Sequence, residues 1–96
     1  MVIAVSGALE KSPEQFVCFK VENNSVRERE AVFTAPGGKA ALIRQLIGLE
    51  IDLLIAGNIN SELEMELFEA GISVIKGISG SADAILKEYL NGTLNF

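Results

Sequence analysis

The sequence predicts an α/β fold: a five-stranded mixed sheet in the order 3-2-1-4-5, with strand 2 antiparallel and three helices shared between its two faces. Three observations lead to this prediction. Two short apolar runs, Val2 to Ser6 and Leu53 to Ala56, lack polar alternation, as expected for strands covered by helices on both faces. Asn23-Asn24 is typical of a hairpin turn. After Pro36, helical and strand patterns alternate, which requires right-handed parallel crossovers.

The first half of the chain predicts three strands. Val2 to Ser6 is the central one, and Gln15 to Val21 is rich in Phe and Val. Asn tolerates positive φ, so Asn23-Asn24 can turn the chain tightly into a third strand, Ser25 to Phe33. That strand carries four successive charges, Arg27 to Glu30, which suit the edge of a sheet because they discourage unwanted pairing.

The second half predicts three helices and two strands. Each helix has an apolar stripe and a glycine as its expected stop. Asn60 or Ser61 is expected to cap the second helix and Ser81 the third. The predicted elements are the helix Lys39 to Ile47 before Gly48, the strand Leu53 to Ala56, a helix ending at Gly71, the strand Ser73 to Lys76, and a helix ending at Gly92.

Length and composition predict one globular domain over residues 1–96. No apolar run approaches the roughly 18–20 residues that cross a bilayer, and the first residues have no basic leader, so we expect a cytoplasmic protein without membrane contact. The net charge of −5 and the lack of a basic cluster argue against nucleic-acid binding. The chain has no histidine, the commonest metal ligand, and a single cysteine, Cys18.

Four short motifs carry a resemblance to a known family. They are Ile55-Ala56-Gly57-Asn58-Ile59, Glu69-Ala70-Gly71-Ile72-Ser73-Val74, Gly77-Ile78-Ser79-Gly80-Ser81 and Tyr89-Leu90-Asn91-Gly92. In this order and spacing they resemble the dinitrogenase iron-molybdenum cofactor biosynthesis family, which includes NifX, NafY and the C-terminal domain of NifB. Ile3-Ala4-Val5-Ser6 matches that family's first strand.

The resemblance implies a ribonuclease H-like fold and a non-catalytic role in binding or carrying iron-molybdenum cofactor or an iron–sulfur precursor. Two departures bear on that role. Many members have a His-Phe-Gly sequence after the first strand, whereas Gly7 to Glu14 holds no histidine. The family's I-A-G-G-I-G motif is also altered here, to Ile55 through Asn60.

The residues themselves favour a binding site at the carboxyl ends of the parallel strands, where the strand order reverses. Two helix N-termini should aim main-chain N–H groups at this edge and could hold a metallocluster or a small anion. The alternative is that these residues only form turns and caps. The candidate ligand-binding residues are Ser6, Gly7, Gly57, Asn58, Gly80 and Ser81.

Other features favour simpler interpretations. The first strand has no carboxylate for the two-metal chemistry of a nuclease. Cys18 is interpreted as a small core residue and not a cluster ligand, because clusters need several thiolates. Glu62, Glu66 and Glu69 predict a solvated helix face, and Met65 a surface or an interface. Gly37-Gly38-Lys39 lacks the spacing of a phosphate loop.

Two functions follow as hypotheses. The first is a non-catalytic binding or carrier domain for a metallocluster, its precursor or a small anion. The second is an interaction module without a ligand, which would form homo-oligomers or bind a protein partner through the hairpin edge or the tail Thr93 to Phe96. With no histidine and no paired inward carboxylates, acid–base catalysis has few candidates, and we expect no enzyme activity.

Overall fold

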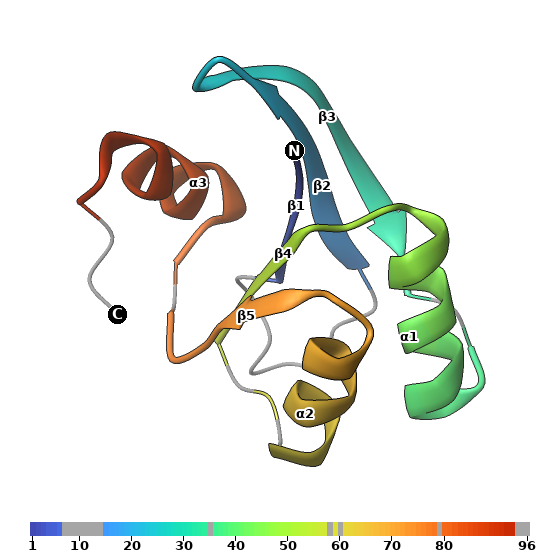
Figure 1. The fold of residues 1–96 in the computed structure, drawn as a ribbon. Coiled ribbons are helices and arrows are strands. Elements are labelled where there is room, and N and C mark those ends of the chain that lie inside the picture. Colours follow the sequence, from blue (N-terminus) through green and yellow to red (C-terminus); the bar gives the residue numbers. More distant parts are fainter. Residues whose placement is uncertain (7–14, 35, 58, 60, 79, 94–96) are drawn as a thin grey trace.

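The computed structural model describes the chain except for residues 7–14, 35, 58, 60, 79 and 94–96. Strands and helices follow one another in the predicted order (Figure 1). The element bounds are β1 Val2–Ser6, β2 Gln15–Glu22, β3 Ser25–Phe33, α1 Gly38–Gly48, β4 Leu53–Ala56, α2 Ser61–Glu69, β5 Ser73–Ile75 and α3 Ala82–Asn91.

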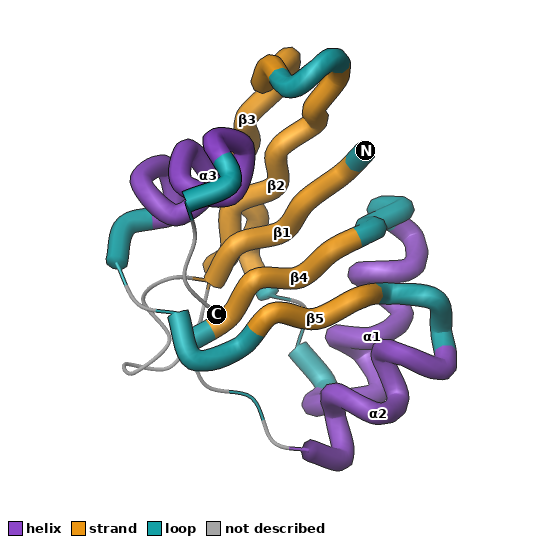
Figure 2. Tube along the Cα trace, turned by 60° about the vertical axis from the view of Figure 1, so that its left-hand side comes forward, coloured by secondary structure: helices purple, strands orange, loops and turns teal. Residues whose placement is uncertain are grey.

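The five strands form one sheet in the order β3-β2-β1-β4-β5, which confirms the predicted order. Strand β1 pairs antiparallel with β2, so that Ala4 lies opposite Cys18, and parallel with β4, so that Ala4 lies opposite Leu54. Strand β3 is antiparallel to β2, and β5 is parallel to β4. Figure 2 shows the two outer strands, β3 and β5, at opposite edges of the sheet. The predicted antiparallel orientation of β2 is also confirmed.

Helices cover both faces of the sheet, as predicted, and each face has its own core. Helix α3 packs on one face; the α3-side core consists of Ile3, Val5, Phe19, Val21, Leu53, Ile55, Ile78, Ile85 and Leu86. Helices α1 and α2 cover the other face (Figure 1). Their core, the α1/α2-side core, consists of Ala4, Phe16, Leu46, Ile51, Leu54, Ala56, Leu67 and Ile72. Alternate residues of β1 thus serve opposite cores, which explains why the strand is apolar throughout.

The hairpin between β2 and β3 turns where the sequence predicts. Asn23 and Asn24 both have positive φ, 51° and 64°, as a two-residue turn of the I′ type requires. The Asn24 side-chain amide donates a hydrogen bond of 3.0 Å to the Leu90 carbonyl near the end of α3. The turn therefore also fixes the C-terminal end of α3 against the hairpin.

All three helices end in the same hydrogen-bond pattern, a Schellman closure. In α2, Gly71 (φ 88°) has the left-handed conformation, and the next N–H, that of Ile72, donates 2.9 Å to the Leu67 carbonyl. Gly92 plays this part in α3, with φ 74°. Both glycines confirm the predicted stops.

The end of α1 differs from the prediction. Gly48 is still helical, and the left-handed residue is Glu50, with φ 58°. Here the Ile51 N–H donates 3.1 Å to the Leu46 carbonyl. Ile51 and Leu46 are both buried in the α1/α2-side core. The apolar contact that accompanies a Schellman closure therefore places the left-handed residue two positions beyond the glycine.

Replacing Glu50 by glycine should stabilise the protein by about 0.5–1 kcal/mol, because only glycine adopts positive φ without a steric penalty. Urea denaturation of wild type and Glu50→Gly measures the difference in the free energy of unfolding. Gly71→Ala, which places a side chain at the equivalent position of α2, is the matched control and should shift stability in the opposite direction. Equal stability of Glu50→Gly and wild type would contradict the strain assigned to Glu50.

None of the helices in the described part of the chain is long and apolar enough to cross a membrane.

Candidate functional site

The carboxyl ends of the three parallel strands lie side by side at one edge of the sheet. Ser6, the last residue of β1, pairs with Ala56, the last residue of β4. Beyond β5, the Gly77 N–H donates 3.0 Å to the Gly57 carbonyl, and the Ile78 N–H donates 3.3 Å to the Ala56 carbonyl. We call this edge, formed by Ser6, Ala56-Gly57, Gly77-Ile78 and Gly80-Ser81, the strand-end rim.

One helix, α3, begins directly at the strand-end rim, whereas α2 lies on the opposite face of the sheet (Figure 1). Helix α2 begins at Ser61, and α3 follows Ser81, which has an extended backbone and caps the helix with its hydroxyl. The Ser81 Oγ accepts a hydrogen bond of 3.2 Å from the Ala84 N–H, which confirms the predicted cap. Gly80, with φ 129°, turns the chain into the helix. The rim therefore includes the positive end of the α3 dipole.

The predicted ligand-binding residues are only partly covered by the structure. Ser6 ends β1, Gly57 directly follows β4, and Gly80 and Ser81 lie between β5 and the first residue of α3. Gly7 and Asn58 lie outside the described residues. The topology thus has the arrangement that the sequence predicts, whereas a binding role for these residues stays a prediction.

The first turn of α3 carries a carboxylate that is already paired. Arg29 Nε and Nη2 donate hydrogen bonds of 2.8 and 3.0 Å to the two Asp83 oxygens. This bidentate pair lowers the pKa of Asp83 and raises that of Arg29. Because the Asp83 pKa is depressed, the pair stabilises the fold at neutral pH and loses its effect as pH falls through that pKa. At neutral pH the charge of Asp83 beside the helix N-terminus is offset by the guanidinium.

Cys18 lies away from the strand-end rim, in the middle of β2. It is half-buried, faces the α1/α2-side core and pairs with Ala4 on β1 and with Glu30 on β3. Desolvation, and to a lesser degree the charge of Glu30, raises the pKa of the thiol. Both effects disfavour the thiolate, which is the form that binds metals. The position agrees with the interpretation of Cys18 as a core residue.

Alkylation of Cys18 by iodoacetamide at pH 8 should be slower in the folded protein than in the urea-unfolded chain, because the raised pKa leaves less thiolate. Glu30→Gln removes one of the two causes and should raise the rate in the folded state only partly. Mass spectrometry of timed samples gives both rates. A folded-state rate equal to that of the unfolded chain would contradict the assigned environment.

Side-chain metal ligands do not gather at one place in the described part of the chain, where no group of three or more His, Cys, Asp or Glu could hold an ion.

Sequence reasoning missed a concave region between α2 and the outer strand β5. It is a groove of about 500 Å³ lined by Ser61, Glu64, Met65, Phe68, Ser73 and Val74. The one available signal is Met65, for which the sequence predicts a surface or an interface and which is 64% exposed. Phe68 could not be placed from the helical pattern, since it neighbours the buried Leu67.

Comparison with known proteins identifies structures with a similar fold and the family of this chain. The chain is similar to the crystal structure of PH0822, with a TM-score of 0.88, 20% identity, and coverage of 100% of this chain and 96% of that one. A candidate dinitrogenase from Methanocaldococcus jannaschii gives a TM-score of 0.76 at 18% identity, with 99% and 92% covered. The NMR structure of a candidate NifB protein from Thermotoga, TM1290 of the DUF35 family, gives 0.74 at 18% identity, with 98% and 90% covered.

At these identities the solved structures establish the shared fold alone. No curated protein matches the sequence. The family profile described as dinitrogenase iron-molybdenum cofactor matches residues 4–92, nearly the whole chain. The profile match covers all four motifs that first suggested the resemblance, and the chain belongs to the dinitrogenase iron-molybdenum cofactor family.

Proposed function

We propose that this protein is a non-catalytic carrier domain of the NifX, NafY and NifB C-terminal type, which holds an anionic metallocluster, its precursor or a small anion at the strand-end rim. One observation supports the proposal: the carboxyl ends of the three parallel strands and the N-terminus of α3 lie along one edge of the sheet. Helix N-termini attract anions through their N–H groups and their dipoles.

The cargo would be bound as an anion and not through protein ligands. Ser6 and Gly7 would form one wall, and Gly57, Asn58, Gly80 and Ser81 would present main-chain donors. Support comes from the α3 N-terminus, where Arg29 offsets the only first-turn carboxylate of that helix, Asp83. Membership of the family also supports a cofactor-related cargo, since the family profile is named for iron-molybdenum cofactor.

Two further parts of the proposal rest on the same relationship. The strand order and the antiparallel β2 agree with the ribonuclease H-like fold that the family resemblance implies. We also infer a cytoplasmic location, since oxygen-sensitive clusters and a lone cysteine suit a reducing compartment.

Anaerobic reconstitution with iron and sulfide, followed by desalting, tests the cluster version. Visible-region absorbance should survive desalting in the wild type and in Cys18→Ala, because the thiol lies away from the strand-end rim. Loss of the absorbance from the wild type would end the cluster version. Loss from Cys18→Ala alone would show ligation by the cysteine and contradict anionic binding.

Titration with molybdate, followed by calorimetry, tests the small-anion version. Ser81→Asp keeps a good helix cap and adds a negative charge at the rim, so it should weaken binding by about tenfold. Ser73→Asp makes the same change at the amino end of β5 and should leave affinity unchanged. Equal affinities of the two variants would place the bound anion elsewhere.

A second candidate function is an interaction module that needs no ligand. The exposed outer strand β3 favours it, since Val26 is 44% and Phe33 is 71% exposed at a sheet edge. The tail, predicted to contribute through Leu94 and Phe96, lies outside the described residues beyond Thr93. Light scattering of the full chain and of a chain cut after Gly92 should reveal an oligomer that the cut weakens. Identical masses and stabilities would count against the tail.

A further inference from the structure

We propose that two copies of this chain associate through the outer edge of β3, as an antiparallel strand pair about a two-fold axis at Ala31 that joins their sheets into one. The inference rests on the second candidate function, the interaction module, and gives that module its partner and its register. The carrier function does not depend on it. In the described part of the chain, β3 has a strand on one side only, which is β2.

Main-chain hydrogen bonds fix the direction in which each residue of β2 bonds. The Met1 ammonium donates 3.0 Å to the Val21 carbonyl, and the Val21 N–H donates 2.8 Å to the Met1 carbonyl, so Val21 bonds toward β1. Alternate residues of an antiparallel strand bond to opposite neighbours. Cys18, three residues before Val21, therefore bonds toward β3, where it lies opposite Glu30. Glu30 thus directs its main-chain groups inward, to β2.

The residues of β3 that alternate with Glu30 direct their main-chain groups to the outer edge. They are Arg29, Ala31 and Phe33, and the β-bulge of the β2–β3 pair lies nearer the hairpin turn, so it does not disturb their alternation. The Phe33 carbonyl agrees with this assignment, because it accepts a 2.8 Å hydrogen bond from Gln45 Nε2 of α1, which is outside the sheet. A carbonyl oxygen has a second lone pair, so this contact leaves room for another donor. An added strand would find its donors and acceptors at these three residues.

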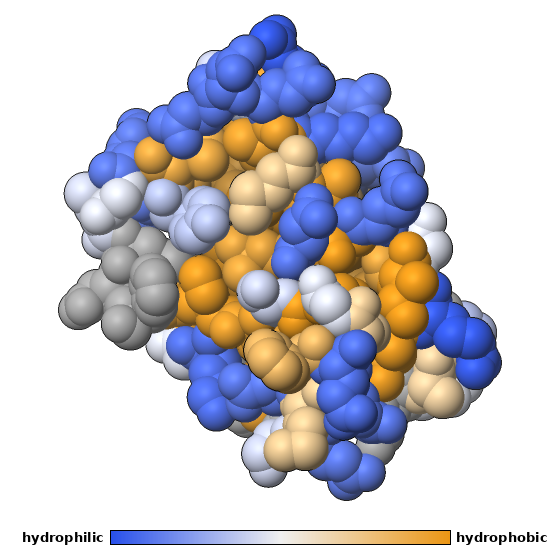
Figure 3. Space-filling model, in the orientation of Figure 1, coloured by the Kyte–Doolittle hydropathy of each residue, from blue (hydrophilic) through white to orange (hydrophobic). Residues whose placement is uncertain are grey.

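The side chains of the three residues lie on one face of the sheet. Arg29 lies on the face covered by α3, since it bonds to Asp83 and its guanidinium lies 6.0 Å from the centre of the Phe19 ring. Ala31 and Phe33, two and four positions further on, share that face. Phe33 is 71% exposed. Figure 3 shows hydrophilic side chains over the hairpin, at the top of the view, so the apolar end of β3 is the end that favours contact with another molecule.

The charges of β3 select one register for the pair. A two-fold axis at any charged residue places that residue opposite its own copy, and like charges directly opposite each other destabilise a sheet. An axis at Val32 or Phe33 would pair only the last residues of the strand. An axis at Ala31 pairs the whole segment from Arg29 to Phe33. Arg29 then lies opposite Phe33 of the second copy, and Glu30 lies opposite Val32. The charges therefore discourage most registers, as the sequence predicts for an edge strand, but not this one.

The contact between Arg29 and Phe33 of the second copy would occur twice, because the axis repeats it. An arginine is attracted to the face of an aromatic ring. The charge of Arg29 does not oppose this contact, since both Asp83 oxygens already accept hydrogen bonds of 2.8 and 3.0 Å from it. Phe33 of each copy would cover this ion pair of the other copy and would lose its own exposure to water.

A β3–β3 pair fits better than a contact between β3 and the other edge strand, β5. Strand β5 has three residues, so it offers a shorter ladder than the nine-residue β3. A β3–β5 contact is also head-to-tail and would extend into open chains, whereas the β3–β3 contact closes after two copies. The paired segment is short for a permanent interface, so we expect a weak dimer, with a Kd of about 0.1–1 mM.

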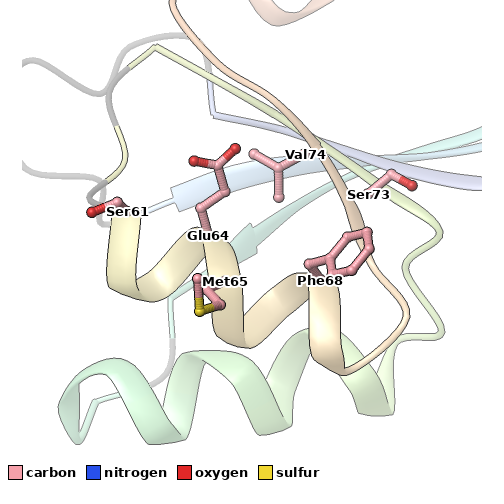
Figure 4. Close-up of a pocket in the computed structure, with 6 residues that line it drawn as sticks. All are labelled: Ser61, Glu64, Met65, Phe68, Ser73 and Val74. Atoms are coloured by element: carbon pink, nitrogen blue, oxygen red, sulfur yellow. The ribbon is translucent and has the colours of Figure 1, made fainter.

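NMR spectra of the ¹⁵N-labelled full chain, diluted from about 1 mM to about 20 µM, test the proposal. Amide shifts should change with concentration and should concentrate on Arg29 to Phe33. Phe33→Ser should weaken the dimer by about tenfold or more, because it removes an apolar contact from both copies. Phe68→Ser is the matched control: Phe68 is 76% exposed but lines the groove between α2 and β5 (Figure 4), and its loss should leave the dimer unchanged.

Two further variants test the direction and the register of β3. Ala31→Pro removes an N–H that points outward, which an edge strand tolerates, so it should abolish the dimer and preserve the β2–β3 pair. In a Cys18→Ser background, Ala31→Cys should form a disulfide between copies in a glutathione buffer, because the axis brings the two Cα atoms to about 5.5 Å. Val26→Cys is the matched control: Val26 is exposed on the same strand but lies far from its copy in this register.

Four results would overturn the proposal. The first is no change of any amide shift up to about 1 mM. The second is a set of concentration-dependent shifts on α2 and β5 that Phe68→Ser abolishes, since the groove would then be the interface. The third is equal cross-linking of Ala31→Cys and Val26→Cys. The fourth is an oligomer that is lost when the chain is cut after Gly92 but survives Phe33→Ser. This last result would leave the interaction module standing and remove only the β3 interface.

Discussion

Phe19→Ala should lower the free energy of unfolding by about 3–5 kcal/mol, as usual for a buried Phe-to-Ala change. Phe19 is 1% exposed and is the largest side chain of the α3-side core. Its ring also lies 6.0 Å from the Arg29 guanidinium, which holds Asp83 at the start of α3. Truncation would leave a cavity under α3 and free the arginine from its support. Since domains are stable by about 5–15 kcal/mol, the variant should be close to unfolding.

Urea denaturation followed by circular dichroism measures this loss. Phe68→Ala deletes the same atoms from a side chain that is 76% exposed, and it should change stability by less than about 0.5 kcal/mol. Comparing Phe19→Ala with Phe68→Ala separates the effect of burial on stability from the effect of residue type. A loss below about 1.5 kcal/mol for Phe19→Ala would show that α3 packs less tightly than the structure indicates.

Gly80→Ala should destabilise the protein by about 1–3 kcal/mol, because φ of 129° is unfavourable for any residue with a Cβ atom. Crowding is not the reason: an added Cβ would meet Ile85 Cγ1 at 3.8 Å, an ordinary contact. The expected response is a change of backbone at Gly80 that displaces the start of α3. Because Gly80 belongs to the strand-end rim, anion binding should weaken together with stability.

Gly48→Ala is the control for this change. Gly48 is the last residue of α1, has no positive φ, and would have no described neighbour within 4 Å of an added Cβ atom. Alanine should therefore leave stability unchanged or raise it by up to about 1 kcal/mol. Denaturation of both variants gives the comparison. Equal behaviour of the two would mean that the left-handed turn before α3 carries no strain.

Most of the fold could be predicted from patterns that are local in the chain. Uninterrupted apolar runs identify β1 and β4 as strands covered on both faces, and Asn23-Asn24 identifies the hairpin. The end of α1 could not be predicted in the same way. Glu50 is not a residue that favours positive φ, and its conformation follows from burial of the residue after it, Ile51. Burial of Ile51 in the folded protein thus outweighs the backbone preference of Glu50.

The candidate sites also differ in how far the sequence predicts them. The strand-end rim follows from strand order, so its described members could be named before any coordinates were known. The groove between α2 and β5 could not be predicted, because the i, i+4 spacing of Leu63 and Leu67 indicates only which side of the helix is buried. Whether Phe68 meets solvent depends on how α2 packs against β5, which the strand order alone does not give.

The attachment of α3 to the hairpin has a consequence for how the molecule would respond to cargo. Asn24 contacts one end of the helix and Arg29 the other, so two polar contacts join α3 to the hairpin in addition to its packing on β1 and β4. Gly57, by contrast, directly follows β4, on the far side of β1. Anything held between Gly57 and the start of α3 would tie the two halves of the sheet together, so that loading would slow amide hydrogen exchange in the hairpin as well as in β4.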